Sequence, residues 1–575
     1  MRNLKQLLYF SLFTFFLSSC ISEAKQEKRK VVIIAEKSDA STLNPVAAGD
    51  EMSLYLSMQI FQTLLGMDFE SQQLVGVLAE GRPKIELKEG NQWMSYQLRP
   101  EARFGDGSAV TMRDVLFSLK ANVCPLVNNL GGASYYGATI DSVIWSATDS
   151  LRITMVCHEL NNRNEFVSGD FSILQERRYD SLLLLRNFSY ESLLHREDLK
   201  ENDTIQQFSE HFNSAKYAYE SDHLSGSGAY RLKEWIKGQR IVLERKEDWW
   251  GDQFAQEHKL FVANAARLQY EVIPDGNTAL SALQAGEVDF IRNISSKIYL
   301  DLLQQDSLPT ITLAAREIYD YNYLAFNLNR TRLANLKLRK AIAHATPRQQ
   351  IIETVFQNQA SLTNVPLPSI RTDLINDTIK GYSYDLEKSK ELIAQTAWKD
   401  ADGDGVLEKE IDGKQQNLEL TFLYNTSNKQ RKAVGLILQN ELKKLGIELK
   451  VEGLEWSVYL QRLRSGDFDI CYGGKLSLPI PPDYSSSFHS KSANGGRNYA
   501  NYQNSSLDSL IEQIGTELDP LRRKDMVNKF QEIVHQDLPY LYLLTPKKHI
   551  AFSKELKNAN IYSLRPNFWA PELSW

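Results

Sequence analysis

The chain has few of the residues that usually form catalytic or metal centres. Its 575 residues include 4 cysteines and 9 histidines, and no two histidines lie within five residues of each other. It also contains no Cys-x-x-Cys pair, no His-Glu-x-x-His, no Gly-x-Ser-x-Gly and no glycine-rich phosphate loop. These absences exclude zinc-ribbon and thioredoxin-type domains and the motif-bearing hydrolases and nucleotide-binding enzymes. We therefore predict a protein that is not an enzyme.

Long hydrophobic runs are missing beyond the N-terminus. No later apolar run approaches the ~20 residues that a membrane helix needs, which excludes a multi-span transporter. The net charge is −6, so nothing indicates the basic surface of a nucleic-acid-binding protein. With 42% hydrophobic and 24% charged residues the chain is typical of soluble globular proteins. The length corresponds to about three to four domains.

The N-terminus has the pattern of an export signal. Arg2 and Lys5 precede an apolar segment from Leu7 to Leu17, which is too short to span a membrane comfortably. The segment ends in Leu17-Ser18-Ser19-Cys20, which resembles the lipobox of a bacterial lipoprotein signal peptide. This resemblance implies lipidation of Cys20 and stable anchoring by two or more acyl chains. The alternative is a chance cysteine after an ordinary secretory signal.

The other three cysteines leave a disulfide question open. Outside the cytosol disulfides are stable, and Cys124 and Cys157 lie in one region of the chain, so they are the first pair to consider. Buried free thiols are an equal alternative for these two residues and for Cys471.

Two regions show the hydrophobic pattern of alternating strands and helices. Residues 267–291 fit strand, helix and strand, with the helix ending at Gly286. Residues 418–472 fit a β-α-β-α-β unit, in which a helix from 429 to 445 ends at Gly446. Such units build open α/β sheets, so we predict an α/β protein with two lobes.

Ligands of open α/β sheets bind beyond the carboxyl ends of the strands, which selects candidate binding residues. Asn425 and Thr426 also precede a helix N-terminus, which favours an anion or a carbonyl oxygen, although simple helix capping is the alternative. The candidates selected by position are Arg292, Asn293, Asn425, Thr426, Tyr472, Gly473, Gly474 and Lys475.

One segment has the spacing of a calcium loop, with aspartates at alternate positions followed by Gly405. The glutamate expected at the twelfth position is missing, because Ile411 stands there next to Glu410. The candidate ligands are Asp400, Asp402, Asp404, the carbonyl of Val406, and Glu410. An acidic turn without metal is the alternative to a structural calcium site.

Several motifs in a fixed order resemble one protein family. They include Phe104-Gly105-Asp106-Gly107 within the segment 93–119, Gly226-Ser227-Gly228-Ala229-Tyr230, and the segments 245–250, 280–291, 327–345 and 498–502. From Val31 to Leu544 the chain is similar to the family 5 bacterial extracellular solute-binding proteins, the oligopeptide, dipeptide and nickel type.

The resemblance implies a type II periplasmic-binding-protein-like fold, with two α/β lobes around an interlobe cleft and an inserted α+β domain. The implied divisions are a signal peptide (1–19), a tether (20–30), a first lobe (30–66, 217–317 and 547–575), the inserted domain (67–216) and a second lobe (318–546).

In function, the resemblance implies a monomeric, lipid-anchored receptor on the periplasmic or extracellular side of a bacterial cell envelope. It would capture peptides by lobe closure and deliver them to an ABC permease with its ATPase subunits, with no cofactor required. Nickel chelates, opines or sugars as ligands, a sensory role, and a lipoprotein hydrolase are the alternatives.

The resemblance also implies roles for individual residues. Peptide-binding members often hold the ligand's amino group with an aspartate after the last strand of the second lobe, which here suggests Asp483. Lys475 would meet a ligand carboxylate or lie in solvent. Tyr319 and Tyr321 would line the cleft or pack in the core, and Asn44 belongs to a segment that resembles the exit of the first strand.

Overall fold

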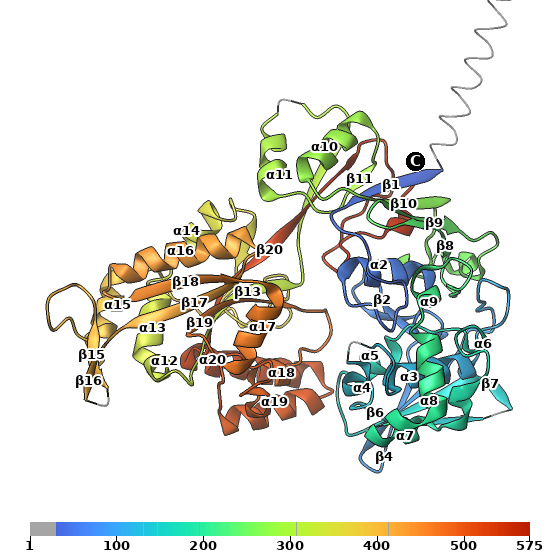
Figure 1. Ribbon diagram of the computed structural model, residues 1–575, viewed down its shortest axis with the longest axis horizontal. Coiled ribbons are helices and arrows are strands. Elements are labelled where there is room, and N and C mark those ends of the chain that lie inside the picture. The colour runs from blue at the N-terminus through green and yellow to red at the C-terminus, as the bar shows by residue number, and fades with distance from the viewer. Residues whose placement is uncertain (1–29, 130, 147, 195, 306, 412) are drawn as a thin grey trace, which may run out of the picture. The chain divides into compact units, whose positions relative to one another are not determined.

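The computed structural model describes residues 30–575 except 130, 147, 195, 306 and 412 (Figure 1). The predicted signal peptide, the predicted lipidation site Cys20 and most of the predicted tether lie outside the described residues. Within the described part of the chain, no helix combines the length and the apolar character needed to cross a membrane.

The chain forms two compact units. The first contains the described residues from Lys30 to Leu160, the segment Asn164–Ala314 and the C-terminal segment His549–Trp575. The second contains Asn161–Arg163 and Ala315–Lys548, so the predicted second lobe, 318–546, lies inside it. Nearly all of the predicted inserted domain, 67–216, belongs to the first unit.

The sheet of the first unit is built around a parallel centre. Strand β1 (Val31–Glu36) pairs in parallel with β10 (Arg267–Val272) and with β11 (Phe290–Ile291). Antiparallel strands β9 (Arg240–Arg245) and β8 (Tyr230–Ile236) extend it beyond β10. The predicted helix after β10 is α10 (Gly276–Ala285), which Asp275 caps and which Gly286 ends in the left-handed conformation.

The segment predicted as an inserted domain has its own four-stranded antiparallel sheet, in the order β4-β5-β7-β6. Its strands are β4 (Lys84–Lys88), β5 (Asn91–Gln97), β6 (Ile140–Ser146) and β7 (Asp149–Cys157). Helix α3 (Met112–Val123) begins after Thr111, whose backbone N–H and hydroxyl both donate to the Asp114 carboxylate.

The other elements of the first unit are short. Its remaining strands are β2 (Leu65–Met67) and β3 (Leu74–Gly76). Its remaining α-helices are α2 (Glu51–Ile60), α4 (Gly132–Tyr135), α5 (Asn164–Gly169), α6 (Glu176–Tyr179), α7 (Tyr190–Leu193), α8 (Asp203–Phe212), α9 (Lys216–Tyr219) and α11 (Ser296–Leu303).

The second unit confirms the predicted β-α-β-α-β pattern. It runs β17 (Glu419–Asn425), α16 (Lys429–Lys443), β18 (Glu448–Leu454), α17 (Trp456–Ser465) and β19 (Ile470–Leu476). Strand β17 pairs in parallel with both β18 and β19. The sheet continues through antiparallel strands β13 (Asp320–Phe326) and β20 (Tyr540–Ser553), so it is mixed rather than wholly parallel.

Both faces of this sheet are covered, as the alternation of apolar residues requires. Leu420 and Phe422 pack with α16 on one face, and Leu423 packs with α17 on the other. Two further strands, β15 (Glu408–Ile411) and β16 (Lys414–Asn417), form a separate hairpin.

Strand β12 (Ile311–Glu317) leads into the second unit, and β20 leads back to the first. The remaining elements of the second unit are β14 (Ala360–Leu362), α12 (Thr331–Ala334), α13 (Leu336–His344), α14 (Arg348–Thr354), α15 (Leu386–Ile393), α18 (Ser485–Phe488), α19 (Ser505–Thr516) and α20 (Pro520–Asp537).

The three described cysteines, Cys124, Cys157 and Cys471, are buried and free. Burial raises the pKa of each thiol to about 12, so the thiolate is scarce at neutral pH. The alternative of buried free thiols is therefore the correct one.

Candidate ligand-binding site

Three of the predicted residues line one pocket in the second unit. Tyr321 lies on β13, Lys475 lies near the end of β19, and Asp483 lies just before α18. With the loop between β19 and α18 they enclose a cavity of about 190 Å³. The strand-end rule selected Lys475, and the family resemblance selected Tyr321 and Asp483; the fold brings the three together across more than 160 positions of sequence.

Lys475 has only neutral hydrogen-bond acceptors. Its ammonium donates to the Ser487 hydroxyl at 2.8 Å and to the Asp483 carbonyl at 3.3 Å. Burial lowers the pKa of Lys475 to about 8, because the charged form loses hydration. Asp483 raises this pKa, whereas Arg163 and Arg497 lower it further. The prediction that Lys475 lies in solvent does not describe this environment.

The Asp483 carboxylate takes part in a local turn. Its Oδ1 accepts from the backbone N–H of Ser485 at 2.8 Å. This is the pattern by which aspartate stabilises a turn before a helix, and it fits the turn-residue alternative. The side chain is half-buried and lines the pocket, so its role toward a ligand amine stays a prediction.

The two candidate tyrosines, Tyr319 and Tyr321, are both buried. Tyr321 packs edge-on against Tyr542 with ring centroids 6.0 Å apart, so it belongs to the core and also lines the pocket. The carbonyl of Tyr319 accepts from the Ser477 N–H at 2.6 Å, which ties the start of the pocket loop to β13.

Neighbouring candidates on β19 are packing residues. Tyr472 is fully buried in the core, and the guanidinium of Arg431 lies 5.2 Å from its ring centroid. An added Cβ on Gly473 would overlap the Tyr323 ring, so the close approach of this ring requires glycine. Gly474 is exposed.

Asn425 and Thr426 make local contacts at the end of β17. The Asn425 side chain donates to Ser427 and accepts from Arg431, both at 2.8 Å, and Thr426 donates to Glu455 at 3.0 Å. The residue that caps α16 is Asn428, not either of them. The hypothesis of an anion at this helix start gains no support from these contacts.

The first unit holds a different kind of strand-end cation. Arg292 is buried, forms two hydrogen bonds of 2.7 and 2.9 Å with the Glu36 carboxylate, and lies 2.9 Å from Glu51 Oε1. Burial alone would lower its pKa, but Glu36 and then Glu51 raise it above the ordinary value. Arg292 therefore links β11, β1 and α2.

Two further candidates, Asn44 and Asn293, lie in the first unit. Asn44 is buried in a turn, where its Oδ1 accepts from the Val46 N–H at 3.1 Å. Asn293 follows Arg292 and is half-buried.

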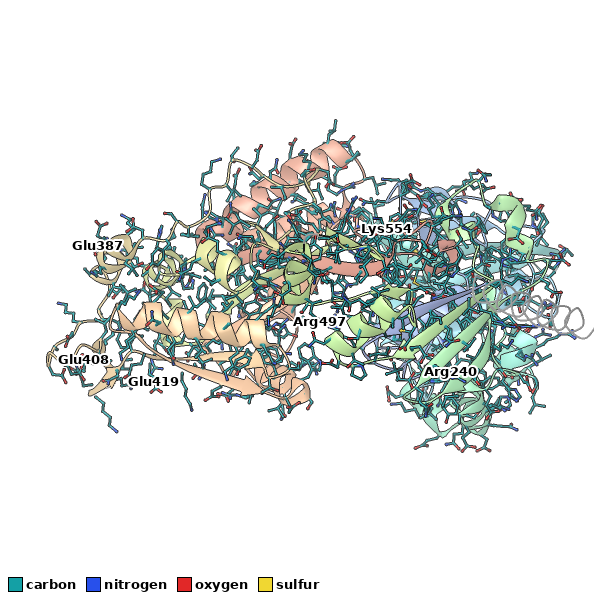
Figure 2. The ribbon with its side chains drawn as sticks, turned by 90° about the horizontal axis from the view of Figure 1, so that it is seen from above. Arg240, Glu387, Glu408, Glu419, Arg497 and Lys554 are labelled. Carbon is teal, nitrogen blue, oxygen red and sulfur yellow. The ribbon has the colours of Figure 1, made fainter. Side chains whose placement is uncertain are left out.

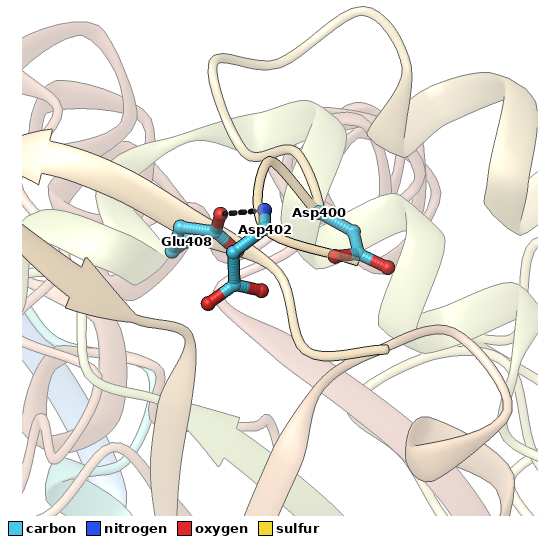
Figure 3. Close-up of side chains that lie close together, drawn as sticks. All are labelled: Asp400, Asp402 and Glu408. Carbon is cyan, nitrogen blue, oxygen red and sulfur yellow. Dashed lines mark hydrogen bonds between the residues drawn. The ribbon is translucent and has the colours of Figure 1, made fainter. Parts of the chain in front are cut away.

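The acidic loop brings Glu408, rather than Glu410, to Asp400 and Asp402 (Figure 3). One carboxylate oxygen from each of the three lies within 4.8 Å of the others. Glu408 accepts from the Ala401 and Asp402 N–H groups at 2.6 and 3.2 Å. Asp404 lies outside this group and accepts from the Val406 N–H at 2.7 Å. Calcium binding here stays a prediction, with Glu408 in place of Glu410.

Two residues that shape the pocket escaped the sequence analysis. Ser487 on α18 accepts the shorter of the two hydrogen bonds of Lys475, and no local signal connects it to that residue. Arg371 donates to the Leu478 and Ile480 carbonyls at 2.9 and 3.1 Å and so supports the pocket loop. No local signal connects Arg371 to a loop over 100 residues away.

Residues 73–497 match the family model described as bacterial extracellular solute-binding proteins, family 5 Middle. The chain belongs to this family. It is accordingly a solute-binding protein without enzymatic activity, as the missing catalytic motifs predicted.

Sequence relatives span nearly the whole chain. The oligopeptide-binding protein AppA of Bacillus subtilis is 26% identical over 568 residues, which cover 96% of this chain and 94% of that protein. The oligopeptide-binding protein OppA of the same organism is 22% identical over 92% of this chain and 91% of its own.

Solved structures share the fold. The structure of AppA from Bacillus subtilis with a nonapeptide has a TM-score of 0.70 at 23% identity, covering 95% of this chain and 98% of that one. The structure of NikA from Brucella suis with Fe(III)-EDTA has a TM-score of 0.76 at 18% identity, covering 95% and 99%. The α/β binding-protein fold expected from the sequence is thereby confirmed.

Proposed function

We propose that this chain is the substrate-binding subunit of an ABC importer and that its ligands are peptides. The observation that carries the proposal is the similarity to the oligopeptide-binding protein AppA across 96% of this chain and 94% of its relative. Family membership by itself supports a solute as ligand, and the named relatives narrow the class to peptides.

The pocket in the second unit supports the same ligand class. It presents the ammonium of Lys475 and the carboxylate of Asp483 in one cavity of about 190 Å³. A peptide carries both charges at its termini and a backbone of hydrogen-bond donors and acceptors. Polar groups at fixed positions in an otherwise apolar pocket are the usual basis of ligand orientation.

The lipobox pattern supports a membrane anchor at Cys20. Two or more acyl chains on this residue give stable attachment, and the polar segment 21–30 then tethers the folded units near the membrane. From this place the protein passes its ligand to a permease and its ATPase subunits.

Native mass spectrometry of protein purified without denaturation tests the ligand class. We expect a mixture of peptides that is released when the protein is unfolded. Recovery of a single metal chelate, opine or sugar would contradict the proposal, and a ligand released in altered form would contradict the absence of catalysis.

Metabolic labelling with a fatty acid tests the anchor. The full-length protein should take up the label and sediment with membranes, and Cys20→Ser should abolish both. Labelling that persists in Cys20→Ser would contradict lipidation at this cysteine.

A further inference from the structure

The ammonium of Lys475 lacks a charged partner in its pocket. Its acceptors are one hydroxyl and one carbonyl, and no carboxylate of the described residues lies within ion-pair distance of it. An ammonium has three N–H donors, so one remains after these two bonds. Lys475 is half-buried, and holding such a group partly out of water without a counter-charge is unfavourable unless a ligand supplies that charge.

The charged groups around Lys475 leave an excess of positive charge. Asp483 is the acid that acts on it, whereas Arg163 and Arg497 add positive charge. Arg163 donates to the Pro481 carbonyl at 3.1 Å, and Arg497 is exposed (Figure 2). Three cations against one carboxylate favour the entry of a further negative charge, even though Asp483 opposes it.

Tyr484 lines the same pocket, and its hydroxyl is buried. Tyr484 is 3% exposed, and its ring stacks on Phe530 with centroids 3.9 Å apart. Its hydroxyl has no hydrogen-bond partner among the described residues. Burial raises the pKa of Tyr484 above its ordinary value, so the group stays a donor at neutral pH. A buried donor without a partner is costly, and an acceptor on a ligand would remove that cost.

We propose that the pocket lined by Lys475 and Tyr484 binds a carboxylate of the ligand peptide. The inference rests on the proposed function and adds to it a requirement for a negative group at this point. A carboxylate has two acceptor oxygens, which match an ammonium and a phenolic hydroxyl, and bonds between charged partners are the stronger ones. The carboxylate is either the C-terminus of the peptide or an Asp or Glu side chain.

Three peptide libraries of matched sequences test this inference on the ligand-stripped protein at pH 7. The first has free C-termini and no acidic residues. The second has amidated C-termini and no acidic residues, and the third has amidated C-termini and one Glu. Native mass spectrometry measures which peptides are retained in competition. We expect at least one carboxylate-bearing library to be retained about tenfold better than the second.

Substitutions test whether Lys475 and Tyr484 cause the difference in retention between the libraries. Lys475→Met should bring the retention ratio close to one. Lys491→Met is the matched control, because Lys491 belongs to the same unit, is 80% exposed and lies 3.5 Å from Glu512; it should leave the ratio unchanged. Tyr484→Phe removes one hydroxyl but keeps the ring on Phe530, so it should lower the ratio without unfolding the protein, as circular dichroism can verify.

The outcomes separate the two proposals. Retention of the first library identifies the C-terminal carboxylate, and retention of the third identifies an acidic side chain. Equal retention of all three by the native protein, or an unchanged ratio in Lys475→Met and Tyr484→Phe, would overturn the carboxylate inference and leave peptide binding intact. Retention of none would overturn peptide binding itself, and this inference with it.

Discussion

Arg292 and Lys475 are both cations that lie at a strand end, yet their surroundings differ. Arg292 in the first unit bonds to Glu36 and lies 2.9 Å from Glu51, and the carboxylates raise its pKa. Lys475 in the second unit bonds to a hydroxyl and a carbonyl, and burial lowers its pKa. The carboxylate partners, rather than the position at a strand end, separate a cation that links elements of the fold from one that lines a pocket.

The comparison also explains why strand-end position alone selects too many residues. Asn425 and Gly473 satisfy the same rule, but the Asn425 amide bonds to Arg431 and Gly473 leaves room for the Tyr323 ring. A strand-end residue becomes a candidate for ligand binding when its polar group retains capacity for a bond after the internal contacts are counted.

The largest expected effect comes from removing the paired cation. Arg292→Met leaves the buried Glu36 carboxylate without a counter-charge and should lower the free energy of unfolding by about 3–5 kcal/mol. Urea denaturation measures the loss. Adding Glu36→Gln should recover part of it, because the uncompensated charge is then gone. If the Arg292→Met variant is as stable as the native protein, Arg292 does not stabilise the fold and the contrast with Lys475 is wrong.

Packing at the end of β19 is tested by Gly473→Ala. The new Cβ would overlap the Tyr323 ring, and overpacking of this kind costs about 1–3 kcal/mol. Gly474→Ala is the matched control, since its Cβ would meet the Asn322 amide oxygen at 2.8 Å, at the end of a rotatable side chain. Thermal denaturation of both variants measures the difference. Equal stability would show that Gly473 is not required by packing.

The retention of carboxylate-bearing peptides should depend on pH through Lys475 and not through Arg292. With a pKa of about 8, Lys475 loses its charge between pH 7 and pH 9, and retention of carboxylate peptides should fall about tenfold. Asp483, Arg163, Arg497, Tyr321 and Tyr484 face or act on this group, and Lys475 is the one whose lowered pKa lies in this window. The competition experiment at both pH values measures the change.

The contribution of Lys475 to the free energy of unfolding should rise with pH, whereas the retention of carboxylate peptides should fall. The unfolded lysine keeps its ordinary pKa of about 10.5, so the unfolded state binds more protons between pH 8 and that value, and the contribution of Lys475 to stability rises with pH. Retention that stays constant to pH 9 would contradict the role of Lys475. Arg292 remains charged throughout and should contribute nothing to the change.

Removing the unpaired cation should hardly affect stability. Lys475→Met takes away a half-buried charge that forms no ion pair with a carboxylate, so the free energy of unfolding should change by less than about 1 kcal/mol or increase. The same urea experiment as for Arg292→Met gives the direct contrast. A loss comparable to that of Arg292→Met would mean that Lys475 also has a structural role.

The smallest effect concerns the acidic loop of the second unit. The calcium hypothesis predicts that about 1 mM Ca²⁺ stabilises the protein by about 0.4 kcal/mol for a site of about 1 mM affinity. Asp400→Asn should abolish this gain, and Glu410→Gln should keep it, because Glu410 lies outside the group of carboxylates. A gain that persists in Asp400→Asn would place the ion elsewhere.

Most of the α/β pattern in the second unit was predictable. The alternation from Leu418 to Tyr424 and the helix stop before Gly446 are local signals, and β17 and α16 lie where they predicted. The antiparallel strands β13 and β20 could not be placed in this sheet from their own residues. They pair with partners far away in the chain, and nothing in a single strand encodes its neighbour.

The candidate site was predictable only where it depends on residues that are close together in the sequence. Lys475 was selected by its place at the end of a predicted strand, and Asp483 by a short motif that resembles one of the family; both are local features of the sequence. Arg371, which supports the pocket loop, and Glu36, which neutralises Arg292 from 256 positions away, belong to long-range contacts.

The sequence by itself determined that the chain has few residues of catalytic type, that its strands and helices alternate, and that it belongs with solute-binding proteins. These properties depend on composition, short-range periodicity and ordered motifs. The tertiary structure alone decided which strand-end cation receives carboxylates and which faces a pocket. The physical reason is that the charge balance of a buried group depends on every element packed around it, and folding brings those elements together from distant parts of the chain.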